Sequence, residues 1–236
     1  MRYETVYGIR PVLEVLRTGR RRVFEVIDSV GNEMVAKAAA TRGVQVKRAS
    51  RQRVEELARG ALHQGVVARV EPYPYSGLQE ILSMSEPLVL VLDGIADPRN
   101  LGAALRAADG AGASGVVIPK DRAVGVTAAA VKASAGASEH VRVARVTNLR
   151  RAVDAMKRAG LWIYAAEAGG TPYTEVDLAG AVALVLGSEG RGVRRLVREE
   201  CDGTISIPML GAVESLNVSV ASAVLLYEAQ RRRGWP

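Results

Sequence analysis

The sequence predicts an α/β protein in which a small α/β module precedes a larger one built on a parallel sheet. Short, continuous apolar runs recur through the second two-thirds of the chain, and such runs are typical of parallel strands buried on both faces. Helical patterns lie between these runs. Because strands that alternate with helices form a parallel sheet with helices on both sides, this arrangement is the fold class that we expect.

Five apolar runs are expected to form the strands of the larger module. They are residues 88–93, 115–119, 161–166, 182–187 and 204–208. Helices are expected over residues 100–111, 127–135, 147–159, 190–200 and 215–233. The run GAGASG at residues 110–115 has the glycine spacing of dinucleotide-binding folds, but it follows a helix and precedes a strand. That order is the reverse of the one that such a site requires.

The start of the chain shows the same alternation on a smaller scale. Ile9, Val12 and Leu13 share one face of a predicted helix, and Ser50 is placed to cap another. Prolines and turn-forming residues then interrupt the pattern. We therefore expect a domain over residues 1–72, a linker with a short helix over residues 73–86, and the larger domain over residues 87–236.

The positive charge of the chain is concentrated in its first third. Residues 1–75 contain fourteen Lys or Arg against eight Asp or Glu, a net charge of +6, whereas residues 76–236 carry only +1. A basic module on a nearly neutral body favours a polyanionic partner such as nucleic acid; a solvated basic surface is the alternative. Aromatic residues make up only 4% of the chain, so contacts to RNA backbone and shape would carry most of the affinity.

Several classes of protein are disfavoured by what the sequence lacks. No apolar run approaches the roughly 20 residues of a membrane span, and the first residues contain no apolar signal-peptide core. The single cysteine, Cys201, permits no internal disulfide, and two histidines are too few for a zinc site. Neither a P-loop nor a G-x-S-x-G nucleophile motif occurs. We expect a cytoplasmic protein that binds no metal and no membrane.

Three stretches follow predicted strands and could do chemistry, because ligands bind beyond the carboxyl ends of parallel strands. The first contains Asn100, which is expected to start the next helix, and Arg106. Six residues of helix correspond to about 600° of rotation, so the two side chains share a site only if Asn100 acts from the loop or the helix start. A helix cap followed by a surface arginine is the plainer interpretation.

The second and third stretches are a glycine-rich turn and a polar helix start. Residues 187–193 hold Glu189 among three glycines, a backbone that either approaches a ligand closely or simply turns. Further on, Glu214 or Ser215 is expected to cap the last helix, with Asn217 in its first turn. Capping needs only one of these groups, and a helix start also suits phosphate. Ordinary capping is the alternative.

In this order, the three stretches resemble the three motifs of the SpoU (TrmH) family of RNA ribose 2′-O-methyltransferases. The matching sequences are DPRNLGAALRAADGAGASGVVIP, LVLGSEGRGV and ISIPMLGAVESLNVSVASAVLLYEAQRRR, and the match spans residues 88–233. The first module contains YGIRPVLEVL and HQGVVARV. These are similar to the substrate-binding extension of the RlmB-type branch, whose members methylate a guanosine of large-subunit (23S) ribosomal RNA.

This resemblance implies a fold, a cofactor and partners. The larger domain would be a SPOUT methyltransferase domain with a parallel sheet and a deep trefoil knot. The smaller one would be an RNA-binding domain of the ribosomal L30/L7Ae type. The cofactor would be S-adenosylmethionine (S-adenosyl-L-methionine), the substrate would be RNA, and the enzyme would be a homodimer with its active site near the subunit interface.

The resemblance also implies roles for single residues. The catalytic positions would be Asn100, Arg106, Glu189, Ser215 and Asn217. The cofactor pocket would be lined by Gly187, Ser188, Gly190, Ile207, Pro208, Met209 and Leu216. It implies no metal ligand.

Two roles are open for Arg106 in such a reaction. Either the site makes its guanidinium able to accept the hydroxyl proton, or Arg106 stays charged and stabilises the developing alkoxide, which fits arginine chemistry better. Asn100 and Glu189 would then hold Arg106 or the ribose, while Ser215 and Asn217 would order the pocket. Two other functions stay open: a transfer-RNA methyltransferase of the same family, and a non-enzymatic RNA-binding protein of ribosome assembly.

Overall fold

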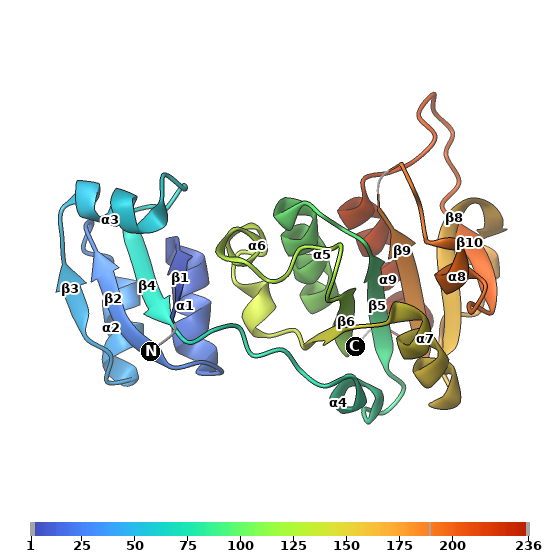
Figure 1. Ribbon diagram of the computed structural model, residues 1–236, viewed down its shortest axis with the longest axis horizontal. Helices are drawn as coiled ribbons and strands as arrows, with labels where there is room; N and C mark the ends of the chain where they lie inside the picture. The colour runs from blue at the N-terminus through green and yellow to red at the C-terminus, as the bar shows by residue number, and fades with distance from the viewer. Residues whose placement is uncertain (1–2, 189, 235–236) are drawn as a thin grey trace.

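The computed structural model of the chain describes residues 3–188 and 190–234. It contains a four-stranded sheet followed by a six-stranded one, so the predicted α/β class is confirmed. In Figure 1 the smaller sheet lies at the left and the larger one at the right, with residues 71–87 running between them.

The first sheet is mixed and has the strand order β1-β4-β2-β3. Its strands are β1 (Glu4–Tyr7), β2 (Val23–Asp28), β3 (Val46–Arg48) and β4 (Val66–Val70). β4 pairs antiparallel with β1 and β2, while β2 and β3 are parallel. The sequence pattern does not predict β1, because its four residues, ETVY, are too few to establish a period.

Helices cover both faces of this sheet. They are α1 (Ile9–Thr18), α2 (Glu33–Thr41) and α3 (Arg51–Ala58). Leu13 of α1 and Val35 of α2 are buried in the main core, whereas Val54 of α3 belongs to a separate cluster on the other face. Ser50 caps α3 as predicted, since its Oγ accepts a hydrogen bond from Arg53 N at 3.2 Å.

The second sheet is parallel throughout, which confirms the prediction, and its strand order is β10-β8-β9-β5-β6-β7. Its strands are β5 (Leu88–Asp93), β6 (Gly115–Pro119), β7 (Val143–Val146), β8 (Trp162–Pro172), β9 (Val182–Gly187) and β10 (Gly203–Ser206). Every residue of β5 is buried, as expected for the continuous run LVLVLD in a covered strand. Because the strands run the same way, their carboxyl ends lie along one edge of the sheet.

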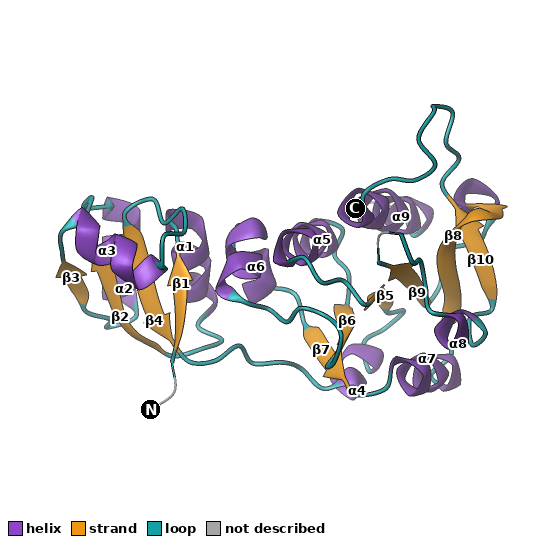
Figure 2. Cartoon of the chain, turned by 45° about the horizontal axis from the view of Figure 1, so that its top comes forward, coloured by secondary structure: helices purple, strands orange, loops and turns teal. Residues whose placement is uncertain are grey.

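A layer of helices packs on each face of this sheet (Figure 2). One layer consists of α5 (Pro98–Gly110), α6 (Ala128–Ala133) and α9 (Val218–Arg232). The other consists of α4 (Leu78–Leu82), α7 (Leu149–Arg158) and α8 (Arg195–Arg198). Short 3₁₀ helices, η1 (Ala137–Glu139) and η2 (Tyr173–Glu175), lie in the connections from α6 to β7 and from β8 to β9.

Two strands of the larger sheet differ from the sequence prediction. The edge strand β7 is not predicted, because its four residues include the exposed Arg145. β8 continues to Pro172 instead of ending at residue 166, since its last residues pair with Ile205 and Ser206 of β10. A neighbouring strand thus determines the length of β8, and the local sequence does not contain that information.

The helix predicted over residues 190–200 is wrong over most of its length. Only Arg195–Arg198 is helical, as α8. The N–H groups of Arg191 and Gly192 both donate to the carbonyl of Ser188, at 3.3 and 2.9 Å, so residues 190–192 fold back onto Ser188 before α8 begins.

The segment between the two sheets is docked on the protein along its length. Tyr73 is buried, Ser76 forms a β-bridge with Ala144 of β7, and the predicted short helix is present as α4. Ile81 of α4 lies in the core beneath the larger sheet. The domain limits at residues 72 and 87 stay a prediction.

Gly102 allows α5 to approach α6 closely. A Cβ atom at this position would lie 2.5 Å from the carbonyl oxygen of Ala130 and 2.5 Å from Cβ of Ala133. We predict that Gly102→Ala lowers the free energy of unfolding by about 1–3 kcal/mol, because overpacking outweighs the gain in helix propensity. Urea denaturation measures this. Gly180→Ala, whose Cβ would meet no atom within 4 Å, is the matched control, and equal losses in both variants would contradict the close approach.

Candidate functional site

The start of α5 places Asn100 at the carboxyl end of β5. The carboxylate of Asp97 accepts a hydrogen bond from Arg99 N at 2.8 Å and Pro98 is the first helical residue, so the helix begins before Asn100. The prediction that Asn100 starts the helix is therefore wrong. Asn100 lies in the first turn of α5 and is partly buried.

The start of α9 places Asn217 beside Asn100. Asn217 Nδ2 donates to Asn100 Oδ1 at 3.0 Å, which joins two of the stretches that the sequence singles out. Asn217 Oδ1 also accepts from Ser219 N at 2.9 Å and from Ser219 Oγ at 2.6 Å. Asn217 is thus the cap of α9, and one side chain both starts the helix and reaches α5.

The predicted cap by Glu214 or Ser215 is wrong. Both residues are exposed and precede the cap, in the loop that links β10 to α9. This loop reaches well beyond the rest of the larger domain at the top right of Figure 1. Over the described chain, the backbone groups of residues 208–216 form no hydrogen bond with other backbone groups. They remain available to a ligand.

This loop forms one wall of a cavity of about 290 Å³. Among the residues that line it are five predicted site residues: Ile207, Pro208, Met209, Ser215 and Leu216. The opposite wall is the extended part of β8, residues 166–169. This wall was not predicted, because the predicted strand stopped at residue 166. No local signal marks the extension, which depends on pairing with β10.

The glycine-rich turn after β9 is shaped mainly by the chain itself. A Cβ atom at Gly187 would lie 1.8 Å from the carbonyl carbon of Gly192, so glycine is required there. Ser188 pairs with Gly192 in a β-bridge. Gly187, Ser188 and Gly190 are not among the residues that line the cavity. Glu189 lies outside the described residues.

An ion pair between a buried carboxylate and a half-exposed arginine, which the sequence did not predict, anchors this turn. Asp93, the last residue of β5, has a fully buried side chain, and its Oδ1 accepts from Arg194 Nε at 2.6 Å. Arg194 N donates to Asp93 Oδ2 at 2.9 Å. A charged residue that ends an otherwise apolar strand was the available signal, since a buried carboxylate needs a partner.

Arg106 lies on α5 with its side chain exposed, well away from Asn100 along the helix. Among the residues that the structure describes, none forms a hydrogen bond or ion pair with its guanidinium. It does not line the cavity. Within one chain, the structure therefore brings together Asn100 and Asn217, and separately the cavity residues, but not Arg106.

The surroundings of Cys201 disfavour its thiolate form. Burial, followed by the nearby carboxylate of Asp202, raises the pKa of its thiol to about 12. The thiolate is the reactive form of cysteine, so covalent catalysis through Cys201 has no support.

Neither a metal cluster nor a membrane helix occurs in residues 3–188 and 190–234. No three His, Cys, Asp or Glu side chains in these ranges are grouped so that they could hold a metal ion. No helix there is both long enough and apolar enough to cross a bilayer. The expectation that the protein needs no metal stays a prediction.

Asn217→Ala should lower the free energy of unfolding by about 1–2 kcal/mol, because it removes the cap of α9 and the bond to Asn100. In a double-mutant cycle with Asn100→Ala, we expect a coupling of about 0.5–1.5 kcal/mol, measured by urea denaturation. Asn148 caps α7 by accepting from Arg151 N at 3.1 Å, so Asn148→Ala is the control. It should be as destabilising but not coupled to Asn100. Additive losses at Asn100 and Asn217 would contradict their contact.

The sequence matches two known families that together span most of the chain. Residues 87–227 match the SpoU rRNA Methylase family, and residues 5–76 match the family described as RNA 2′-O ribose methyltransferase substrate binding. The chain is 44% identical to the 23S rRNA (guanosine-2′-O-)-methyltransferase RlmB of Escherichia coli K12. That alignment covers 98% of this chain and 99% of the relative.

Solved structures with the same fold include one with a bound cofactor. The SpoU methyltransferase AviRb from Streptomyces viridochromogenes, in complex with the cofactor AdoMet, has a TM-score of 0.82 and 26% identity, over 98% of this chain and 90% of that one. The TrmH/SpoU tRNA modifying enzyme of A. aeolicus has a TM-score of 0.57 and 30% identity, over 66% of this chain and 80% of that one.

Proposed function

The chain belongs to the SpoU rRNA methylase family, and from this premise we propose that it transfers a methyl group from S-adenosylmethionine to the ribose 2′-hydroxyl of a guanosine in 23S ribosomal RNA. The proposed substrate rests on the alignment with the 23S rRNA methyltransferase, which spans 98% of the chain and includes both modules. The tRNA modifying enzyme covers only 66% of the chain and leaves a third of it unmatched. Ribosomal RNA is therefore favoured over transfer RNA.

We assign the cavity beside the loop 207–216 to S-adenosylmethionine. The residues present fit such a group: Ile205, Ile207 and Leu216 offer an apolar surface for a flat base, and the unbonded backbone groups of the loop offer donors and acceptors. Glu167 also lines the cavity. Gly187, Ser188 and Gly190 would then shape the neighbouring turn instead of lining the pocket.

When bound, the cofactor supplies a methyl group on a positively charged sulfur, which is the electrophile of the reaction. The attacking ribose oxygen develops negative charge as its proton passes to solvent water, and a guanidinium stabilises such charge well. We assign this role to Arg106. Asn100 and Asn217 would hold the ribose or its phosphate beside the methyl group, and their mutual hydrogen bond fixes both amides for this task. Ser215 and Glu189 complete the proposed site.

We propose that the enzyme acts as a homodimer. Arg106 is exposed in a single chain, so the catalytic set is brought together only when a second subunit covers α5. Exposed apolar side chains lie on the nearby loop and on α9: Leu210 (101% exposed), Val213 (66%) and Val220 (47%). Such a patch beside a functional loop suits an interface between subunits.

Further proposals concern the topology of the chain, its division into domains and its location in the cell. We propose that the return from β10, at the edge of the sheet, to α9, which packs against α5, forms a deep trefoil knot. Residues 1–72 would bind RNA, residues 87–236 would transfer the methyl group, and residues 73–86 would link these two domains. The protein would work in the cytoplasm, where its single thiol stays reduced.

The direct test incubates the protein with methyl-labelled S-adenosylmethionine and either 23S ribosomal RNA or transfer RNA, and maps the blocked ribose by sequencing. We expect one modified guanosine in ribosomal RNA. Label in transfer RNA alone would favour the other branch of the family. RNA binding without any transfer would favour a non-enzymatic role in ribosome assembly.

Arg106→Ala should abolish methyl transfer, a loss of at least about 10²-fold in turnover, because charge on the ribose oxygen is no longer stabilised. The folded state and the affinity for RNA should change little, since Arg106 is exposed and makes no hydrogen bond or ion pair among the described residues. Arg151→Ala, an exposed arginine on α7, is the control. Near-normal turnover of the Arg106 variant would contradict its assignment.

The basic module should bind RNA through its phosphates. We predict that replacing Arg51 and Arg59, both exposed, by Gln weakens RNA binding. The slope of log K against log salt should become shallower by about 1 for each arginine that no longer pairs with a phosphate, because fewer counterions are released on binding. Filter binding at several salt concentrations measures this slope. Arg151→Gln on the larger domain is the control. An unchanged slope would show that the charge of this module serves only solubility.

A further inference from the structure

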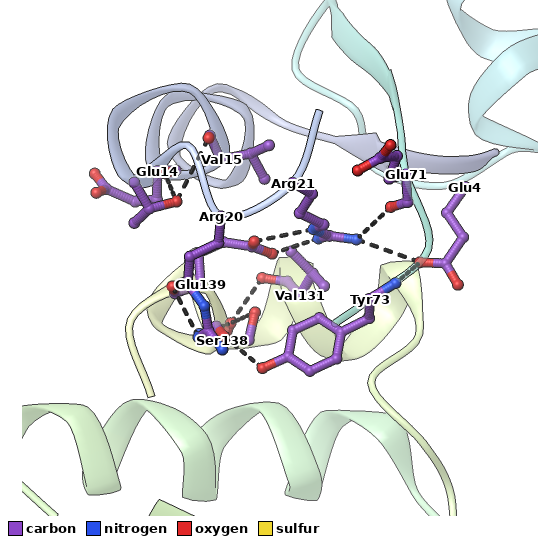
Figure 3. A network of polar contacts seen from close by, with 12 residues as sticks. Glu4, Glu14, Val15, Arg20, Arg21, Glu71, Tyr73, Val131, Ser138 and Glu139 are labelled. Atoms are coloured by element: carbon purple, nitrogen blue, oxygen red, sulfur yellow. Dashed lines mark hydrogen bonds and ion pairs between the residues drawn. The ribbon is translucent and has the colours of Figure 1, made fainter. Parts of the chain in front are cut away.

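A buried ion pair joins the two modules. The side chains of Arg21, just before β2, and Glu139, in η1, are each only 1% exposed. Arg21 Nε donates to Glu139 Oε2 at 3.0 Å, and Arg21 Nη2 donates to Oε1 of the same carboxylate. This bidentate geometry fixes the direction as well as the distance of the contact. Figure 3 shows the guanidinium facing the carboxylate between the modules.

The remaining groups around this pair are also bonded. Arg21 Nη1 donates to the carbonyl of Glu71 and to Glu4 Oε2, each at 3.3 Å. The buried hydroxyl of Tyr73 donates to the carbonyl of Ser138 at 2.7 Å, and burial raises the pKa of this phenol, which keeps it a donor. These bonds, visible in Figure 3, tie β1 and the end of the first module to the same short turn.

Other contacts at this junction are weaker but also join the two modules. Arg20 Nη1 donates to the carbonyls of Glu139 and Val141, at 3.2 and 3.0 Å. His140 Nε2 lies 3.0 Å from Glu14 Oε2, and Lys132 Nζ lies 2.5 Å from Gln64 Oε1. Both of these pairs are exposed to solvent, so they contribute little energy. The Arg21–Glu139 pair is buried and bidentate, and apolar residues of both modules share one core beside it.

The turn that receives these bonds is firmly attached to the helix of the candidate site. η1 follows α6 after three residues, 134–136, and α6 packs so closely on α5 that a Cβ atom at Gly102 would lie 2.9 Å from Ser134 N. α5 carries Asn100 and Arg106. The first module is therefore connected to the site through η1 and the two packed helices α6 and α5.

We propose that the Arg21–Glu139 pair and the bonds around it hold the RNA-binding module in one orientation, and that this orientation selects which ribose reaches the site of methyl transfer. Arg21 and Glu139 are positioning residues in this proposal, which rests on the proposed function. A buried pair adds little stability compared with apolar side chains of the same size, but it can enforce one geometry. Apolar contacts between the modules in the shared core are non-directional, whereas the bidentate pair specifies one geometry.

The test compares three variants of the full chain. Glu139→Gln keeps the shape of the side chain and removes its charge. Arg21→Met combined with Glu139→Leu replaces the pair by apolar side chains that still fill the junction. Asp154→Asn, which breaks an exposed ion pair with Arg158 on α7, is the control. Small-angle X-ray scattering reports the orientation of the modules, and sequencing of methylated ribosomal RNA reports the target.

In Glu139→Gln we expect a larger radius of gyration and about a tenfold fall in methylation of the target ribose, with new minor sites, because misplacement disrupts alignment. S-adenosylmethionine affinity by calorimetry should not change. The double variant should melt like the wild type yet not recover the selectivity, which a purely stabilising pair would recover. Wild-type scattering and selectivity in Glu139→Gln or in the double variant would overturn the proposal. If the wild type transfers no methyl group, the proposed function fails, and the scattering comparison still tests the orientation.

Discussion

The candidate site depends on the hydrogen bond between Asn217 and Asn100, two residues 117 positions apart in the sequence. Each asparagine lies at the start of a helix on the same face of the larger sheet, and the parallel strands bring both helix starts to one edge. The bond fixes the end of the loop 207–216, whose backbone is otherwise unbonded to other backbone in the described chain. α9 packs against α5 in the same helix layer, and this bond adds a directed contact between the end of the loop and the first turn of α5.

The ion pair between Asp93 and Arg194 complements this bond. It lies at the same carboxyl ends of the strands, toward the other face of the larger sheet. A buried carboxylate is unfavourable unless donors surround it, and here three donors come from Arg194 alone. The turn after β9 is therefore held against the end of β5. The close approach of Gly187 to Gly192 tightens the same turn. Polar contacts between loops, and not only packing of the apolar core, thus define the shape of the site.

The features that the sequence predicted correctly are those determined by residues close together in the chain. The run LVLVLD predicted a buried central strand, and Ser50 predicted a cap, because burial and capping are determined within a few residues. The extension of β8 and the strand β7 depend on pairing with strands elsewhere in the chain, so no local pattern contains them. The cap by Asn217 is a local bond to Ser219, but the bond of Asn217 to Asn100 required the fold. The motifs identified the family and named Ile207 and Leu216 as cavity residues, whereas the partnership of Asp93 with Arg194 required the fold.

Hydrogen–deuterium exchange of the free protein and of the protein with S-adenosylmethionine tests the central claim most directly. The amides of residues 209–216 form no backbone hydrogen bond over the described chain, so they should exchange quickly in the free protein. If the methyl donor occupies the cavity, these amides and those of residues 166–169 should become protected together, while α7 does not change. Binding of the cofactor without protection of the loop 207–216 would contradict the assignment of the cavity and the site built around it.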